Sequence, residues 1–225
     1  MINTQTAINK TNEFWKNFYT KNELKNEASS FALWCIKNYI KNTDKILEIG
    51  CGNGRDSFTF IANENDIFAI DGCDVAIANN IEHLNNFTHN SKVRFQALDF
   101  NYLEKLLDDK IIIDNINIVY SRFVLHAIPE VLEDKILTFI YNNLPEGVVS
   151  LHEFRTNKDP LSKKGTTLSK NEMITDHYRR FIDTDKFREK VKKIGFKEIY
   201  FIESNNLAVY KDDNPVVARI VLQKA

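Results

Sequence analysis

Residues 46–56 read Ile-Leu-Glu-Ile-Gly-Cys-Gly-Asn-Gly-Arg-Asp and carry the clearest chemical signal in the sequence. Three glycines occupy alternate positions directly after a short apolar run, and an acid, Glu48, precedes the first of them. Glycine lets a chain turn sharply and approach a ligand without a Cβ clash. In an open α/β sheet, ligands bind beyond the carboxyl ends of the strands. The segment therefore predicts a ligand-binding loop between a strand and a helix.

Two kinds of ligand compete for this loop. A dinucleotide site requires the pattern Gly-x-Gly-x-x-Gly, and Arg55 stands where the third glycine would be. A side chain of that size would obstruct both the close packing of helix on strand and the approach of a pyrophosphate. A nicotinamide-dependent oxidoreductase is therefore the weaker alternative.

Two acids follow the loop at suitable spacing. Asp71 ends the next apolar run, twenty-one positions after Gly50, where a carboxylate can accept hydrogen bonds from both hydroxyls of a ribose. Asp99 ends the run after that and is followed by Phe100. A glycine loop alone would be a weak signal, and these partners make it specific.

This ordered set of motifs resembles the signature of class I S-adenosylmethionine-dependent methyltransferases over residues 44–154. The resemblance implies S-adenosyl-L-methionine as cofactor and S-adenosyl-L-homocysteine as product, with Asp99 at the adenine amino group and Phe100 packed on the ring. The expected cofactor-binding residues are Glu48, Gly50, Cys51, Gly52, Asn53, Arg55, Asp56, Asp71, Gly72, Asp99, Phe100, Ser121 and Trp15. A methyltransferase-like protein that binds without catalysis is a further alternative, which the intact set of motifs disfavours.

The methyl acceptor depends on less specific residues. Methyl transfer from a sulfonium needs alignment and exclusion of water, so no metal is expected. A sugar hydroxyl would benefit from a general base, for which we predict His126, with His152 and His177 as alternatives. An anionic oxygen would instead need cationic groups. The expected substrate-binding residues are Tyr19, Arg122, Arg155, His177, Tyr178, Arg179 and Arg180.

Within the superfamily, four segments are similar to methyltransferases of bacterial capsule and surface-glycan biosynthesis. They are Phe14-Trp15-x-x-Phe18-Tyr19, residues 54–57, residues 121–126 and residues 177–181. This likeness implies a small-molecule or glycan-precursor acceptor, methylated on a sugar hydroxyl or on a phosphoryl or phosphoramidate oxygen.

The pattern of apolar runs predicts the elements that position these residues. We expect strands at 45–49, 67–71, 93–99, 117–121, 148–154, 196–202 and 216–222, and helices at 5–19, 28–41, 54–64, 74–87, 101–108, 130–143 and 184–194. Their alternation predicts an α/β fold with a single Rossmann-like, doubly wound sheet of about seven strands. The sheet is mostly parallel, and its last strand is antiparallel because no helix separates it from its neighbour. Gly195 is expected to cap its helix.

We expect one methyltransferase domain over residues 1–225, with an N-terminal helical cap at 1–43 and a substrate-side insertion at 155–182, after the fifth strand. The insertion is polar and is predicted to contain one helix at 169–180. The basic residues expected at the acceptor lie mostly in this segment.

The bulk composition excludes several classes of protein. The net charge of −1 shows no bias toward nucleic acid, and no apolar run is long enough to insert into a membrane. Cys35, Cys51 and Cys73 lack the Cys-x-x-Cys spacing of a zinc site, and reduced thiols fit a cytoplasmic protein. The oligomeric state cannot be read from the sequence.

Overall fold

The central element of the computed structural model, which describes residues 4–21 and 27–225, is a seven-stranded sheet in the order β3-β2-β1-β4-β5-β10-β9. Its strands are β1 (Lys45–Ile49), β2 (Asp66–Asp71), β3 (Val93–Ala97), β4 (Ile118–Arg122), β5 (Val149–Arg155), β9 (Lys197–Ser204) and β10 (Val217–Gln223). Strands β1 to β5 are parallel, whereas β10 pairs antiparallel with both β5 and β9. The predicted fold class, including the antiparallel last strand, is confirmed.

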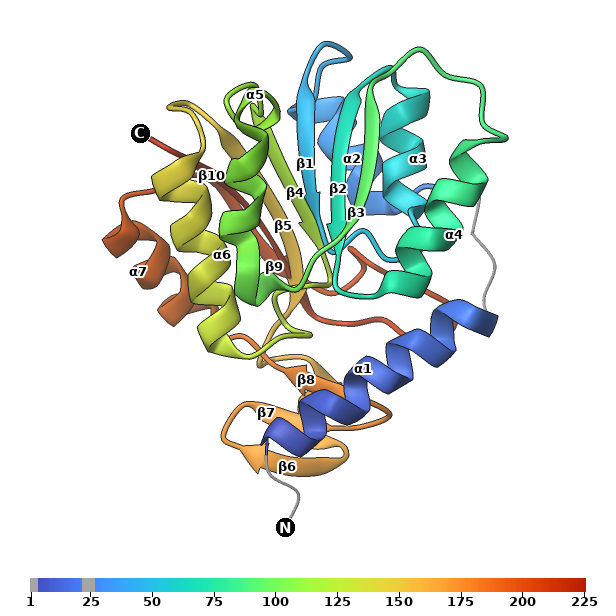
Figure 1. Ribbon diagram of the computed structural model, residues 1–225. Coiled ribbons are helices and arrows are strands. Elements are labelled where there is room, and N and C mark those ends of the chain that lie inside the picture. The colour runs from blue at the N-terminus through green and yellow to red at the C-terminus, as the bar shows by residue number, and fades with distance from the viewer. Residues whose placement is uncertain (1–3, 22–26) are drawn as a thin grey trace.

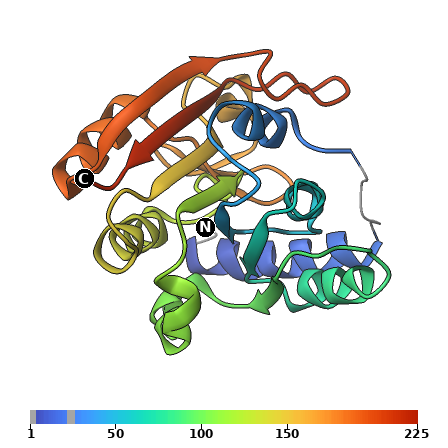
Figure 2. The same ribbon diagram turned by 90° about the horizontal axis from the view of Figure 1, so that it is seen from above.

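Helices cover both faces of this sheet (Figure 1, Figure 2). One face carries α2 (Ser30–Asn38), α3 (Arg55–Ala62) and α4 (Asp74–Leu84), and the other carries the 3-10 segment η1 (Phe100–Asp109), α5 (Lys110–Ile113), α6 (Glu130–Asn143) and α7 (Thr184–Ile194). Two clusters of buried apolar side chains fill the two sides, which is the expected core of a doubly wound fold. Gly195 ends α7 with a φ of 119°, as expected for a cap.

Helix α1 (Thr4–Lys21) crosses the carboxyl ends of the strands (Figure 1). One side of it meets a small sheet of β6 (Thr166–Ser169), β7 (Glu172–Ile174) and β8 (Tyr178–Arg180), where the backbone N–H of Tyr178 donates to Thr11 Oγ1 at 2.9 Å. The other end meets α4, where the Asn79 amide donates to the carbonyl of Tyr19 at 3.1 Å. Two separate contacts therefore hold α1 over the edge of the main sheet.

The prediction of a helix at 169–180 is wrong, because these residues contain the hairpin of β7 and β8. Side-chain burial there alternates: Tyr178 and Arg180 point inward while Arg179 is more exposed, which is the period of a strand. A further 3-10 turn, η2 (Pro160–Lys163), precedes the hairpin. The segment predicted at 101–108 is the 3-10 segment η1 rather than an α-helix, and it begins at a cap formed by Asp99.

Three predicted helices are shorter than expected, and the one predicted at 54–64 spans Arg55–Ala62. The helix predicted at 28–41 begins at Ser30, because Ser29 is its N-cap and accepts a hydrogen bond from the N–H of Ala32. The helix predicted at 74–87 ends at Leu84. In the described part of the chain, no helix is long and apolar enough to cross a bilayer.

Candidate functional site

The glycine loop lies at the carboxyl end of β1, between the end of β4 and helix α1. Gly50 has a φ of 75°, and a Cβ atom there would lie 2.2 Å from Cγ2 of Val124. Gly52 has a φ of 52°, and its Cβ would lie 2.5 Å from the Tyr19 hydroxyl. Both positions therefore require glycine for conformation and for space.

Asp71, the last residue of β2, is bonded to this loop. Its carboxylate accepts hydrogen bonds from the backbone N–H groups of Gly52 and Cys73, each at 2.8 Å. Burial raises its pKa, and these two bonds oppose that shift. A carboxylate has about four lone-pair sites, so Asp71 retains acceptor capacity for ligand hydroxyls.

An amide from α4 holds the loop on its other side. Asn80 Nδ2 donates to the carbonyl of Gly52 at 2.8 Å and contacts Cys51 Sγ at 3.8 Å. Sequence reasoning missed Asn80, although it lies on the same helical stripe as the buried residues Ala76 and Ile77. A polar residue on such a stripe is the signal that could have identified it.

Three predicted cofactor residues make bonds within the protein. Glu48 is buried and accepts from the Ser57 hydroxyl, while burial and the nearby carboxylate of Asp56 raise its pKa to about 8. Asp56 accepts from the Ser29 N–H, the Ser29 hydroxyl and the Tyr120 hydroxyl at 3.0, 2.8 and 2.6 Å. Arg55 Nε donates to the carbonyl of Glu27 at 2.6 Å. Arg55 and Asp56 thus fasten the chain that leads into α2.

The remaining predicted cofactor residues lie along the same edge of the sheet. Asn53 lies in the glycine loop and Gly72 in the bend after β2. Asp99 is exposed after β3 and accepts from the N–H of Asn101 at 2.8 Å, and Phe100 packs against the apolar core. Ser121, near the end of β4, is bonded to Nδ1 of buried His152 at 2.7 Å. Burial lowers the pKa of His152 to about 4.

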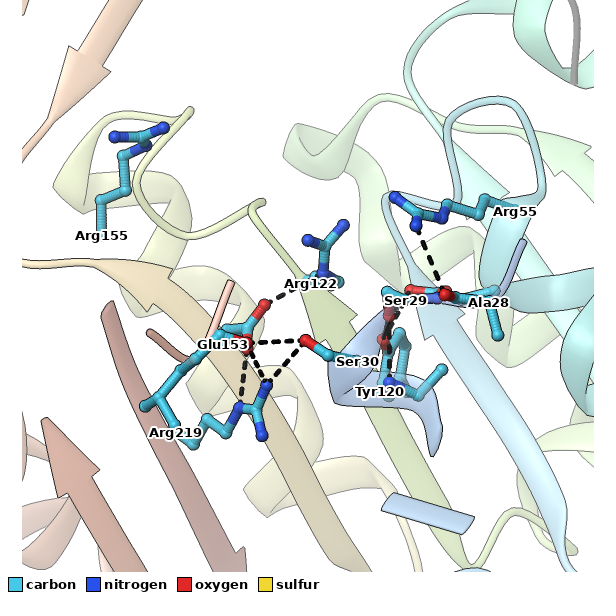
Figure 3. A network of polar contacts seen from close by, with 12 residues as sticks. Ala28, Ser29, Ser30, Arg55, Tyr120, Arg122, Glu153, Arg155 and Arg219 are labelled. Carbon is cyan, nitrogen blue, oxygen red and sulfur yellow. Dashed lines mark hydrogen bonds and ion pairs between the residues drawn. The ribbon is translucent and has the colours of Figure 1, made fainter. Parts of the chain in front are cut away.

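A charged network joins the ends of β4, β5 and β10 (Figure 3). Glu153 is fully buried and accepts from Arg122 Nε at 3.0 Å and from Arg219 Nε at 2.7 Å. Arg219 Nη2 also donates to Ser30 Oγ at 3.1 Å and to the carbonyl of Leu207 at 2.8 Å. Sequence reasoning missed Glu153 and Arg219, whose signal is a charge inside an apolar strand.

His126 follows β4 and is 4% exposed. Its Nδ1 accepts a hydrogen bond from the backbone N–H of Arg155 at 3.3 Å. Burial, together with the positive charges of Arg155 and Arg179, holds the pKa of His126 well below its usual range. The ring is therefore neutral and carries its proton on Nε2.

The other predicted acceptor residues are engaged by partners inside the protein. Arg155 pairs with Asp159 at 2.9 Å and also with Asp213. The two arginines of β8 are paired as well, Arg179 with Asp176 and Arg180 with Glu133. The Tyr178 hydroxyl donates to Glu172 Oε1 at 2.6 Å. Within the described chain, these groups stabilise the insertion rather than projecting free charge into the site.

Aromatic side chains of α1 face the insertion and the glycine loop. The ring of His177 lies 4.6 Å from that of Phe14 and 4.7 Å from that of Trp15, and burial lowers its pKa to about 4. Trp15 stacks on Tyr19 with ring centroids 5.8 Å apart. Burial and the negative charge of Asp71 raise the pKa of Tyr19. The structure thus brings Tyr19, Gly52 and Asp71 together.

A family model described as a methyltransferase domain matches residues 40–205. These residues contain β1 to β9, including the glycine loop, Asp71 and Arg122. No curated protein matches the chain.

Solved structures share the fold at low sequence identity. A SAM-dependent methyltransferase of Methanosarcina mazei has 15% identity and a TM-score of 0.67, over 84% of this chain and 96% of that chain. An S-adenosylmethionine-dependent methyltransferase of Clostridium acetobutylicum has 13% identity and a TM-score of 0.66, over 96% and 98%. The 4+2 cyclase SpnF has 13% identity and a TM-score of 0.71, over 99% and 97%. These likenesses concern the fold alone, since structures with different reactions share it.

Proposed function

Because the chain belongs to the methyltransferase domain family and is an S-adenosylmethionine-dependent methyltransferase, we propose that it methylates an oxygen atom of a small acceptor molecule. The family sets aside the nicotinamide-dependent and non-catalytic alternatives. The acceptor class that we propose is a glycan precursor, methylated on a sugar hydroxyl or on a phosphoryl oxygen.

One observation supports a small acceptor. Helix α1 and the sheet of β6, β7 and β8 lie over the carboxyl ends of the main strands, where the glycine loop is (Figure 1). The Tyr19 hydroxyl reaches the glycine loop itself at Gly52. With helix α1 and this small sheet over the strand ends, a small molecule or a chain end can still enter, whereas a broad polymer surface cannot dock.

The residues at this edge fit the cofactor. The loop has positive φ at Gly50, Gly52 and Gly54, so its backbone can lie close to a ligand. In this proposal Asp71 accepts hydrogen bonds from the ribose hydroxyls, and Asp99, which follows the neighbouring strand, accepts one from the adenine amino group. When bound, S-adenosylmethionine supplies an already activated methyl group, so the protein has to align the acceptor and exclude water.

The neutral ring of His126 suggests how the acceptor is oriented. Its Nδ1 accepts from the Arg155 backbone, so its proton on Nε2 is available for donation to an oxygen. A neutral donor of this kind suits an acceptor oxygen that is already anionic, which needs no base. Trp15 and Tyr19 exclude water from the cofactor side in this proposal.

A transfer assay tests the acceptor class. The protein would be incubated with S-adenosylmethionine and separate panels of sugar phosphates, nucleotide sugars, neutral sugars, proteins and nucleic acids, with S-adenosylhomocysteine release as the readout. We expect turnover with the sugar-derived panels and an O-methyl product by mass spectrometry. Turnover confined to proteins or nucleic acids, or methylation of nitrogen or carbon, would overturn the proposal.

A further inference from the structure

We infer that Arg122 binds an anionic group of the methyl acceptor, a carboxylate or a phosphoryl group, and that Glu153 and Arg219 hold it in position. This inference rests on the proposed function, because it assigns a substrate class to the same site. Of the four arginines expected at the acceptor, Arg155, Arg179 and Arg180 each pair with a carboxylate through a terminal nitrogen, so the inference assigns the cationic role to Arg122.

The hydrogen bonds of Arg122 leave one side of its guanidinium for a ligand. Among the described residues, its bonded partner is Glu153, which it reaches through Nε at 3.0 Å. The two terminal nitrogens point away from Glu153 (Figure 3). A guanidinium presents its donors as a planar fork that matches carboxylate and phosphate oxygens in pairs. The terminal side of Arg122 is therefore shaped for an anion.

The ion pairs of the network join one carboxylate to two guanidinium groups. Glu153 supplies one negative charge, and Arg122 and Arg219 supply two positive charges. The remaining bonds of Arg219 go to neutral oxygens, on Ser30 and Leu207. The carboxylate of Asp56 also raises the pKa of Arg122, but its oxygens accept hydrogen bonds from Ser29 and Tyr120. The terminal nitrogens of Arg122 are therefore not paired with a second carboxylate, and an anionic ligand can bind them.

The place of Arg122 in the sheet favours the acceptor as the source of that anion. Arg122 is in register with Glu153 of β5, so its side chain leans over β4 and β5. Asp71 and Asp99 follow β2 and β3, on the other side of β1. The adenosine end of the cofactor belongs to that side, and ligands in such sheets cross at the switch point between β1 and β4. The space over β5 is thus left to the acceptor.

The next residue keeps Arg122 in place. Phe123 has a φ of 61°, which a phenylalanine rarely adopts, and its N–H donates to the carbonyl of Glu153 at 2.8 Å. Its ring lies 4.4 Å from the Arg122 guanidinium carbon, so it covers one face of the fork. Strained residues of this kind persist where the surrounding structure requires them, and they gather at ligand sites. Phe123 and Glu153 together restrict the fork to one orientation.

The test uses inorganic phosphate as probe on protein saturated with S-adenosylhomocysteine. Phosphate binding would be followed by phosphorus NMR line broadening, and cofactor binding by calorimetry. We expect Arg122→Gln to weaken phosphate binding by about tenfold or more while cofactor affinity stays within about threefold. Arg122→Lys keeps the charge but loses the forked arrangement of donors. Its phosphate affinity should therefore lie between that of the wild type and that of Arg122→Gln. Unchanged phosphate binding in Arg122→Gln would overturn the inference.

A matched control and two further arms separate the possible failures. Arg188→Gln removes one positive charge on α7, where Arg188 pairs with Glu198, and should leave both affinities unchanged. If Arg122→Gln weakens binding of S-adenosylhomocysteine about tenfold but leaves binding of decarboxylated S-adenosylmethionine unchanged, Arg122 binds the cofactor carboxylate and the inference is wrong. Failure of the wild type to bind S-adenosylhomocysteine would instead contradict the function itself. Thermal unfolding of each variant establishes that it is folded.

Discussion

The Tyr19 hydroxyl lies directly over Gly52, so helix α1 touches the loop that is expected to bind the cofactor. An alanine at Gly52 would place its Cβ 2.5 Å from that hydroxyl, at a φ of 52°. The left-handed conformation alone costs a residue with a Cβ about 1–2 kcal/mol. We therefore expect Gly52→Ala to weaken S-adenosylhomocysteine binding about tenfold in calorimetry. Adding Tyr19→Phe should recover part of that loss, because the nearest atom is removed.

Gly147 is the matched control for this substitution. It also has a positive φ, of 80°, but a Cβ there would meet nothing within 4 Å, and it lies before β5, remote from the glycine loop. Gly147→Ala should lower stability by a similar strain and leave cofactor affinity unchanged. Equal loss of affinity in both variants would mean that the effect of Gly52→Ala is general destabilisation.

Asp71 should contribute to cofactor affinity through its charge. Replacing it with asparagine keeps the shape but converts one acceptor oxygen to a donor, which faces the N–H of Gly52 or Cys73. Hydrogen bonds to charged groups contribute about 1.5–3 kcal/mol, so we expect binding of S-adenosylhomocysteine to weaken by about ten- to a hundredfold. Asp66→Asn, at the opposite end of the same strand, is the control, since the Asp66 carboxylate accepts from the N–H of Lys92 at 2.8 Å. Unaltered affinity in Asp71→Asn would remove Asp71 from the cofactor site.

Local patterns predict the part of the candidate site that is local in the chain. The glycine loop, Asp71 and Asp99 follow successive strands, and periodicity identifies such strands without knowledge of their neighbours. The network of Arg122, Glu153 and Arg219 joins strands that are far apart in sequence, so no pattern of residue spacing predicts it.

The insertion shows the same limit from the other side. The sequence predicts that its arginines face the acceptor, because it does not show which carboxylates they meet. Arg180 meets Glu133, forty-seven positions away, only because β8 packs beside α6. The sequence predicts a helix in place of the hairpin, since strands of three residues, such as β7 and β8, are too short for alternation to stand out.

Arg180 and Arg179 should therefore differ in their contribution to stability. Arg180 is buried, pairs with the fully buried Glu133 and donates to the carbonyl of Leu125 at 3.1 Å. Lys190 Nζ also pairs with Glu133 at 2.8 Å, so this carboxylate keeps one cation without Arg180. We expect Arg180→Ala to lower the free energy of unfolding by about 1.5–3 kcal/mol, the contribution of hydrogen bonds to a charged group. Arg179 pairs with the half-exposed Asp176, so Arg179→Ala should cost about 1 kcal/mol or less. Urea unfolding measures both. A stable Arg180→Ala protein that fails only with the acceptor would restore Arg180 to the substrate site.

Glu48 should make stability depend on pH in an unusual direction. Its pKa is raised from an ordinary value of 4.5 to about 8, by burial and by the carboxylate of Asp56, while the bond from Ser57 opposes the shift. The folded state therefore holds a proton that the unfolded state releases near pH 4.5. The stability contributed by protonated Glu48 is fully present below the unfolded pKa and is lost as pH rises toward the folded pKa of about 8.

Glu48→Gln isolates this effect, because glutamine has the same shape, cannot ionise and can still accept from the Ser57 hydroxyl. We expect the free energy of unfolding of the variant, relative to wild type, to rise between pH 5 and pH 8 by up to about 1.4 kcal/mol per pH unit. Urea unfolding of both proteins at several pH values measures the difference between their free energies of unfolding. Groups that titrate alike in the two proteins contribute equally to both values and cancel in this difference. Parallel stability curves would mean that Glu48 is ionised in the folded protein at neutral pH. Its charge would then have to be balanced within the glycine loop, since Ser57 supplies a single hydrogen bond and Asp56 repels it.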